Sequence, residues 1–173
     1  SCGVHIDFNC RNVVIQHCFS MNNEGGFIEI LGNNHNCAYR YNISVGDGTR
    51  TKGKGGAHQE GKVFWLSGYC GRKPRSGPFN SYIYNNTIYV NSDITGTWSI
   101  QDTFSGLLVA NNIFFVEGDT EDITGDWADN YTQQDADSVI WENNLYQRID
   151  IVPTFYEDTL DQPSFTDTAP RYG

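Results

Sequence analysis

One pattern recurs along this chain: a short run of alternating apolar residues, one fixed position, and a second short apolar run. Five segments align on it without gaps: Val13–Phe19, Cys37–Ile43, Ser81–Thr87, Leu107–Ile113 and Val139–Leu145. The fixed position is Cys in the first segment and Asn in the others, which gives the column Cys18, Asn42, Asn86, Asn112 and Asn144. Successive members of this column are 24, 44, 26 and 32 residues apart. The shorter spacings suit one turn of a solenoid, and the longer ones indicate the same turn with an inserted loop.

The alternation predicts β-strands with one buried face, because successive side chains of a strand point to opposite sides. An Asn between two short strands tolerates the left-handed backbone of a sharp bend. When such turns stack, each side-chain amide can donate one hydrogen bond along the stack and accept another. We therefore expect the asparagine ladder of a parallel β-helix, ended by a small buried side chain at Cys18.

A third apolar run precedes four of these strand pairs and would complete a three-stranded coil. The candidates are Gly3–Phe8, Gly26–Leu31, Lys62–Ser67 and Thr97–Asp102. The composition agrees, since 18 Gly and 17 Asn supply turns and the aromatic content of 14% favours strands. The predicted fold class is therefore all-β, a parallel β-helix of about four to five coils.

Four strings of the sequence support a family resemblance: NCRNVVIQHCFSMNNEGGFIEILG, YRYNISVGDG, YIYNNTIYV and VANNIFFV. With them the chain resembles right-handed parallel β-helix proteins of the pectate-lyase-like superfamily, over roughly residues 3–150. It is most similar to the secreted members from polysaccharide-degrading bacteria. The resemblance implies polysaccharide as the partner and a secreted, periplasmic or cell-surface location. It leaves the activity open, because this fold is shared by lyases, hydrolases, esterases, epimerases and tailspikes.

The coils are predicted to fill residues 1–150, with inserted loops at about 46–61, 68–79 and 117–137. Residues 151–173 are rich in Asp, Thr and Pro and lack the repeat, so we expect a tail that caps or drapes over the last coil. Four to five coils are few for the resembling proteins, and the chain starts almost directly in a predicted strand. We therefore expect that further coils precede Ser1 or that another chain covers this end, because an uncapped coil exposes apolar surface and strand edges.

The charge balance disfavours several kinds of partner. With 11 Lys and Arg against 21 Asp and Glu, the formal net charge is −10, which argues against binding to nucleic acid or to an anionic membrane. No apolar run approaches the ~20 residues of a transmembrane helix, so we do not expect an integral membrane protein.

Seven of the eleven basic residues nevertheless lie within residues 50–75, where Glu60 is the single acidic residue. Such a patch would attract an anionic ligand, and uronate-containing polysaccharides are the candidates in the resembling superfamily.

The third strands place polar residues on the outside of the coils. If Ile6 and Ile30 point inward, His5 and Asp7 point outward on one coil and Glu29 points outward on the next. Adjacent strands are ~4.8 Å apart, so His5 and Glu29 are expected to be near neighbours. Outward polar side chains of successive coils form the usual catalytic surface in the resembling enzymes.

These residue types suit lyase chemistry on a uronate. β-Elimination needs a group that neutralises the carboxylate, a base for the neighbouring ring proton and an acid for the leaving oxygen. The predicted catalytic residues are Lys52, His58, Arg72, His5, Asp7, Glu29 and Glu60. The predicted substrate-binding residues are Lys54, Arg75, Trp65, Tyr69 and Trp98, the last three because flat rings can stack on sugars. A Ca²⁺ ion held by Asp7, Glu29 or Glu60 could replace a cationic side chain.

Two other functions stay open. Glycoside hydrolysis needs two carboxylates, either about 5 Å or about 6.5–9.5 Å apart, which Asp7 with Glu29, or Glu29 with Glu60, could supply. A non-catalytic glycan-binding or adhesion module would use the same patch without chemistry.

The five cysteines, Cys2, Cys10, Cys18, Cys37 and Cys70, are an odd number and have no C-x-x-C spacing. This argues against a zinc knuckle or a thioredoxin-like site. We expect buried free thiols, with one disulfide left open.

Overall fold

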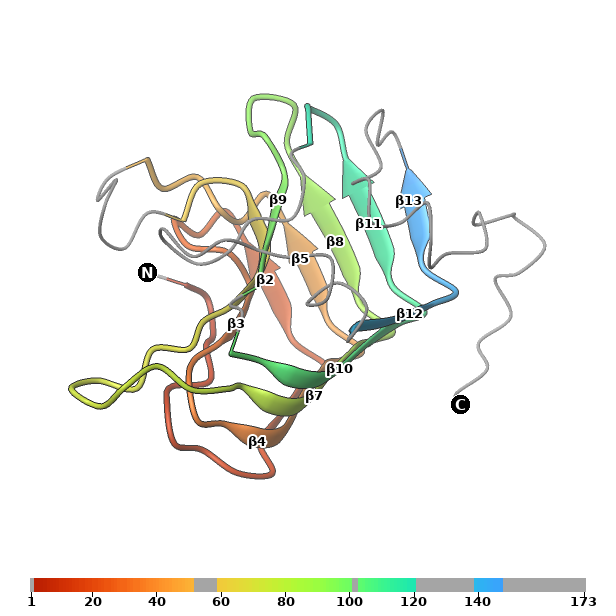
Figure 1. The fold of residues 1–173 in the computed structure, drawn as a ribbon. Coiled ribbons are helices and arrows are strands. Elements are labelled where there is room, and N and C mark those ends of the chain that lie inside the picture. Colours follow the sequence, from red (N-terminus) through yellow and green to blue (C-terminus); the bar gives the residue numbers. More distant parts are fainter. Residues whose placement is uncertain (1, 52–58, 101–102, 121–138, 148–173) are drawn as a thin grey trace.

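The computed structural model describes residues 2–51, 59–100, 103–120 and 139–147 of the chain. These described residues form thirteen β-strands and no helix (Figure 1). The strands are β1 (Val14–Gln16), β2 (Phe19–Met21), β3 (Ile28–Ile30), β4 (His35–Arg40), β5 (Ile43–Val45), β6 (Lys62–Leu66), β7 (Phe79–Tyr84), β8 (Thr87–Val90), β9 (Thr97–Ile100), β10 (Ser105–Ala110), β11 (Ile113–Val116), β12 (Val139–Glu142) and β13 (Leu145–Gln147). Across these ranges, no helix has the length and apolar character that a membrane span requires.

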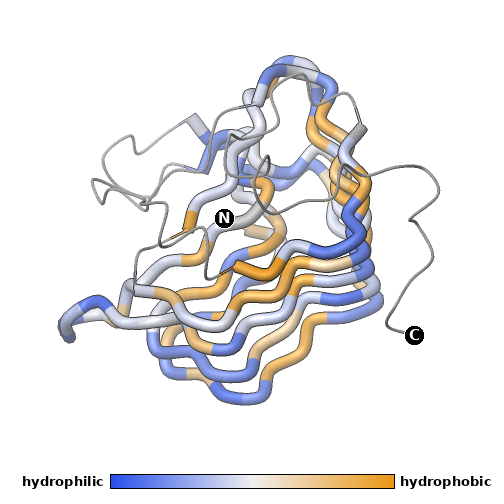
Figure 2. Tube along the Cα trace, turned by 45° about the vertical axis from the view of Figure 1, so that its right-hand side comes forward, coloured by the Kyte–Doolittle hydropathy of each residue, from blue (hydrophilic) through white to orange (hydrophobic). Residues whose placement is uncertain are grey.

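The strands form three sheets, and the predicted all-β class is confirmed. Sheet A has the order β3–β6–β9, sheet B the order β1–β4–β7–β10–β12, and sheet C the order β2–β5–β8–β11–β13. All neighbouring strands are parallel. From β1 to β11 the chain visits sheets B, C and A in turn, and we call one such pass a rung. Figure 2 shows the rungs stacked one on another, an arrangement compatible with a parallel β-helix.

Stacked apolar columns between the sheets form the core. In sheet B the register places Tyr39, Ile83, Val109 and Trp141 side by side, and all four side chains are buried. Their chain neighbours point outward, as the alternation predicts, and Tyr82 beside Ile83 is exposed. Burying one such side chain contributes about 1.5–3 kcal/mol, so each rung gains stability from the rungs on either side.

The predicted asparagine ladder is present at the corner between sheets B and C. The Nδ2 atoms donate to the next Oδ1 at 2.9 Å from Asn42 to Asn86, 3.0 Å from Asn86 to Asn112, and 2.9 Å from Asn112 to Asn144. The same oxygens also accept the backbone N–H of the preceding ladder residue. At the end of the column Cys18 donates its backbone N–H to Asn42 Oδ1 at 3.0 Å, and its thiol adds no amide to the ladder.

The sharp bend at this corner lies one residue earlier than predicted. The residues with positive φ are those before the ladder positions: His17, Tyr41, Asn85, Asn111 and Asn143. The ladder residues keep ordinary φ values, because their backbone N–H and side chain both bond to the next rung. Asn adopts the left-handed backbone conformation more readily than most residues. His17 and Tyr41 adopt it too, and their side-chain rings stack on one another with centroids 5.6 Å apart.

Sheet A is shorter than the sequence predicts. The predicted strand Gly3–Phe8 forms only one isolated bridge, from Ile6 to Ile30. A register shift between Lys62 and Phe64 interrupts the pairing of β6 with β9. Residues 46–61 connect β5 to β6, and residues 67–78 connect β6 to β7. Most of the predicted loop at 117–137 and the whole predicted tail at 151–173 lie outside the described residues.

All five cysteines are free. Cys37 and Cys70 are buried, as predicted, and Cys2, Cys10 and Cys18 are half-buried. The disulfide that the sequence left open is therefore not formed.

Candidate functional site

The outer face of sheet A holds a row of side chains from successive rungs. Glu29 pairs with Trp65, and Trp65 pairs with Ser99. His5 lies beside Glu29, because the next residue, Ile6, bridges to Ile30. Although these side chains point away from the core, Glu29 is only 6% exposed and Trp65 only 8%. The outer face is therefore covered rather than open to water at these two residues.

Glu29 is the centre of a polar cluster with Cys2, His5 and Gln59. The Cys2 thiol donates a short hydrogen bond to Glu29 Oε2. Cys2 Sγ also lies 3.0 Å from Gln59 Oε1, and Gln59 Nε2 donates to Glu29 Oε2 at 3.5 Å. The ligand atoms that Cys2, His5 and Glu29 offer to a metal all lie within 4.8 Å of one another. Two segments far apart in the sequence, one with Cys2 and His5 and the other with Gln59, thus converge on one buried carboxylate.

The environment of Cys2 keeps its thiol protonated. Burial raises the pKa of Cys2 to about 12, and the neighbouring Glu29 carboxylate raises it in the same direction. A protonated thiol can donate to the carboxylate, which agrees with the hydrogen bond between them. In this state Cys2 is a poor nucleophile, because the reactive form of cysteine is the thiolate.

Tyr39 holds the backbone of Glu29 from the core side. Its hydroxyl lies 3.0 Å from the carbonyl oxygen of Glu29 and 3.1 Å from that of Val4. Burial raises the pKa of Tyr39, so the phenol is neutral and available as a donor. The carboxylate of Glu29 is therefore attached to a fixed segment of backbone.

Lys62 lies across the middle of the same face. Its Nζ is 3.9 Å from the centroid of the Trp65 ring and donates to Ser99 Oγ at 3.3 Å. The cation therefore occupies the ring face that a sugar would need for stacking. Trp65 lies on the outer face of sheet A beside Glu29, but a ligand would have to displace Lys62 to reach its ring.

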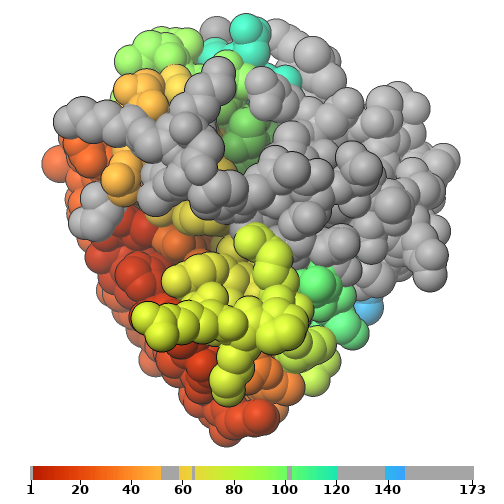
Figure 3. Space-filling view, turned by 60° about the vertical axis from the view of Figure 1, so that its left-hand side comes forward, coloured from red at the N-terminus to blue at the C-terminus, as the bar shows by residue number. Residues whose placement is uncertain are grey.

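The connection 67–78 stands beside this face and is basic. Arg72, Lys73 and Arg75 are exposed, and Tyr69 is 47% exposed with its ring edge-on to Phe8 at 5.7 Å. Figure 3 shows this connection, in yellow-green, projecting from the molecule next to the red first rung. Backbone hydrogen bonds from Gly32 and Asn33 to Tyr69 and Ser76 attach it to the second rung. Its cationic side chains can therefore approach an anionic ligand from the side.

The structure removes one of the predicted sugar platforms. Trp98 has 0% exposure and packs edge-on against Phe114 at 6.0 Å. Trp98 pairs with Phe64, whereas Trp65 pairs with Ser99. Because successive residues of a strand point to opposite faces, Trp98 points inward while Trp65 points outward. The Trp98 ring cannot stack on a sugar.

Two further predicted residues that the structure describes, Asp7 and Glu60, do not join the metal-ligating group around Glu29. Asp7 is exposed and accepts the backbone N–H of Phe8 at 2.8 Å, and its position one residue after Ile6 places it beside Leu31. Glu60 is half-buried in the turn before β6. Lys52, Lys54 and His58 lie outside the described residues.

Sequence reasoning missed Cys2 and Gln59 as members of the site. In the sequence Cys2 is one of five cysteines without a recognisable motif, although its three-residue spacing from His5 places both on one segment beside Glu29. Gln59 follows a long insertion, and no sequence pattern fixes where the chain returns to the sheet.

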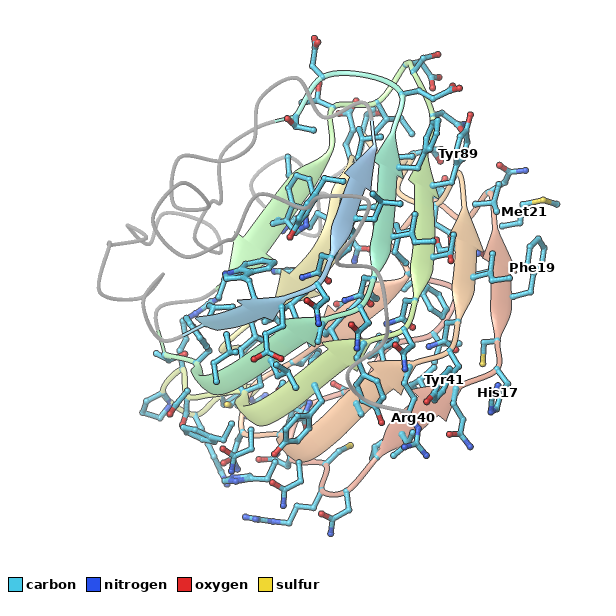
Figure 4. The ribbon with its side chains drawn as sticks, turned by 90° about the vertical axis from the view of Figure 1, so that its right-hand side faces the viewer. His17, Phe19, Met21, Arg40, Tyr41 and Tyr89 are labelled. Atoms are coloured by element: carbon cyan, nitrogen blue, oxygen red, sulfur yellow. The ribbon has the colours of Figure 1, made fainter. Side chains whose placement is uncertain are left out.

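A second surface lies on sheet C and is apolar. Phe19, at 65% exposure, and Met21 extend outward from β2, Ile43 is exposed on the neighbouring strand β5, and Ile113 is exposed on β11 of the same sheet. Figure 4 shows Phe19, Met21 and His17 at the outer side of the first rung, with Tyr41 and Arg40 next to His17. This surface contains no described group of metal-ligating side chains, in contrast to sheet A.

Comparisons of the chain with protein-family models, with curated proteins and with solved structures find no match.

Proposed function

We propose that this chain is a right-handed parallel β-helix of the pectate-lyase-like type that binds an acidic polysaccharide beside sheet A and cleaves it by β-elimination. The main support is the connection 67–78, where Arg72, Lys73, Arg75 and Tyr69 are exposed and the Tyr69 ring packs edge-on against Phe8. An exposed basic loop on a chain of net charge −10 selects an anionic ligand over a neutral one. The three parallel sheets visited in turn, together with the stacked Asn side chains, support the β-helix.

Each side chain has a role in this proposal. Arg72 and Arg75 neutralise the uronate carboxylate, which makes the neighbouring ring proton more acidic. His5 is exposed at the edge of the face and takes that proton as the general base. Tyr69 supplies the exposed ring for one sugar unit. Lys52, Lys54 and His58 remain further candidates from the sequence.

Hydrolysis is the weaker alternative. Glu29 is buried and accepts hydrogen bonds from Cys2 and Gln59. Asp7 lies beside Leu31 and accepts a hydrogen bond from the backbone N–H of Phe8. A hydrolase needs two carboxylates that face each other across the sugar. These contacts favour elimination over a mechanism that pairs Asp7 with Glu29.

The test incubates the protein with an acidic polysaccharide and, separately, with a neutral one. Elimination creates a double bond, so ultraviolet absorbance should rise together with new reducing ends on the acidic polymer alone. Reducing ends without absorbance would indicate hydrolysis. Binding without either signal would leave the non-catalytic glycan-binding module.

A pair of variants tests the basic loop. The double variant Arg72→Ala/Arg75→Ala should bind the acidic polymer several-fold more weakly, since each exposed ion pair contributes roughly 0.2–1 kcal/mol. Arg40→Gln is the charge control. Arg40 is the last residue of β4, whereas His35, the first residue of β4, lies at the end of the strand nearer the connection 67–78. The two residues are five positions apart, which is about 16 Å along a strand. Equal binding by the double variant and the control would contradict the proposed role of the loop.

A further inference from the structure

Cys2, His5 and Glu29 bring three different metal-ligating groups to one point on the first two rungs. Their ligand atoms, a thiol sulfur, an imidazole nitrogen and a carboxylate oxygen, all lie within 4.8 Å of one another. Ligands of one zinc ion are ~2.0–2.3 Å from the metal, so small side-chain rotations would bring these atoms into a common sphere. The imidazole of His5 is exposed and has no hydrogen-bond partner within the described ranges, so it can turn toward the other two.

The buried carboxylate gives an independent reason to expect a cation. Glu29 is 6% exposed, and its described partners are a thiol and a side-chain amide, neither of which is positively charged. Burying a carboxylate without an opposite charge is costly, and proteins usually pair it with a cation or use it to coordinate a metal. A divalent cation at this point would supply the missing positive charge.

We propose that Cys2, His5 and Glu29 form a binding site for a zinc-class transition-metal ion. A donor set of sulfur, nitrogen and oxygen suits Zn²⁺ and related first-row metals, whereas Ca²⁺ takes oxygen ligands almost alone. Three protein ligands leave a fourth position, and Gln59 Oε1, 3.0 Å from Cys2 Sγ, or a water molecule can fill it. This assignment differs from the Ca²⁺ site that the carboxylates alone suggested, and it does not depend on the proposed polysaccharide cleavage. A zinc-bound His5 would not act as the general base, so proton abstraction would then fall to Lys52 or His58, the predicted candidates outside the described residues.

The packing around the cluster constrains Cys2, Gln59 and Glu29. A Cβ at Gly25 would lie 2.2 Å from Gln59 Oε1 and 2.6 Å from the backbone nitrogen of Cys2. Only glycine therefore lets Cys2 and Gln59 approach each other over this position. On the other side, Tyr39 bonds to the backbone carbonyl of Glu29 at 3.0 Å. Such support of the ligands is typical of metal sites.

Metal binding should release a proton. The thiol hydrogen of Cys2 now bonds to Glu29, and coordination requires the thiolate and a free carboxylate oxygen. The thiol proton leaves to solvent when the sulfur–metal bond forms, and no redox change occurs. Affinity should therefore rise with pH.

The first experiment titrates the untagged, metal-free chain with Zn²⁺ by calorimetry in two buffers of different ionisation enthalpy. We expect one ion per chain and a buffer-dependent heat that reports proton release. Titration with Co²⁺ should give a thiolate-to-metal charge-transfer band in the near ultraviolet. Zinc should also protect Cys2 from alkylation, as read by peptide mass spectrometry.

Matched variants identify the ligands. Cys2→Ser, His5→Gln and Glu29→Gln should each weaken Zn²⁺ binding at least about tenfold. Cys10→Ser and His17→Gln remove a half-buried thiol and an exposed imidazole outside the cluster and should bind like the parent chain. Circular dichroism establishes that each variant is folded before it is titrated.

Three results would overturn the proposal. One is the absence of Zn²⁺ binding at about 100-fold excess over the chain. Another is a cobalt complex that lacks the thiolate band or leaves Cys2 open to alkylation. The third is equal zinc affinity in Cys2→Ser and Cys10→Ser. Cleavage of polysaccharide does not enter these readouts, so they separate failure of the metal site from failure of the proposed function.

Discussion

At the scale of single residues, the side-chain amide of Asn86 links three rungs. Its Oδ1 accepts from the backbone and side-chain nitrogens of Asn42, and its Nδ2 donates to Tyr39 O and Asn112 Oδ1 at 3.0 Å each. Asn86→Ala would leave buried polar groups of Asn42 and Tyr39 without partners. We expect a loss of about 3 kcal/mol or more in the free energy of unfolding, measured by urea denaturation.

Asn85 is the matched control for this prediction. It precedes Asn86 in the chain and has φ 56°, a conformation that glycine adopts readily. Asn85→Gly should therefore change the free energy of unfolding by only a few tenths of a kcal/mol. Similar losses in the two variants would show that the ladder contributes no more than the bend beside it.

The same scale shows why the sequence predicted part of the candidate site. The 24-residue spacing of Ile6 and Ile30 was enough to place His5 beside Glu29, since strand alternation fixes which neighbours point outward. It did not reveal that Glu29 is buried, because Cys2 and Gln59 cover it through contacts that no periodicity encodes.

At the scale of elements, the basic connection 67–78 depends on a close approach to the second rung. A Cβ at Gly32 would lie 2.4 Å from the carbonyl oxygen of Gly68 and 2.5 Å from Cys70 Sγ. Gly32→Ala should therefore push the connection outward, at a cost of about 1–3 kcal/mol in stability. Trypsin should then cleave after Arg72 or Arg75 faster than in the parent chain.

Gly96→Ala is the control for this displacement. A Cβ there meets side-chain atoms of Val116 at 3.1 and 3.3 Å, which can yield more easily than backbone. Its rate of cleavage at Arg72 and Arg75 should equal that of the parent. An unchanged rate in Gly32→Ala as well would mean that the connection is not held by this contact.

Element positions were predictable from the sequence only where the repeat is regular. The ladder column and the strands around it follow from spacing, and the structure confirms the parallel sheets. Sheet A was less predictable, because long connections separate its strands and a register shift follows Lys62. Trp65 and Trp98 therefore looked equivalent in the sequence, yet one points outward and the other fills the core.

At the scale of the whole molecule, stability should be uneven along the stack of rungs. Within the described part of the chain, β1 and β2 have a parallel neighbour on one side only, whereas β7 and β8 have neighbours on both. In a stacked architecture each rung is stabilised mainly by adjacent rungs, so rungs with one neighbour open more often.

Hydrogen exchange followed by mass spectrometry measures this difference directly. We expect the amides of β7 and β8 to exchange at least about tenfold more slowly than those of β1 and β2 at low protein concentration. Each pair belongs to the same two sheets, so strand type and sheet are matched in the comparison. Equal protection that persists on dilution would contradict the expectation of one-sided stacking. Protection of β1 and β2 that appears only at high concentration would instead mean that a second copy of the chain covers their free edges, because a bimolecular contact is lost on dilution.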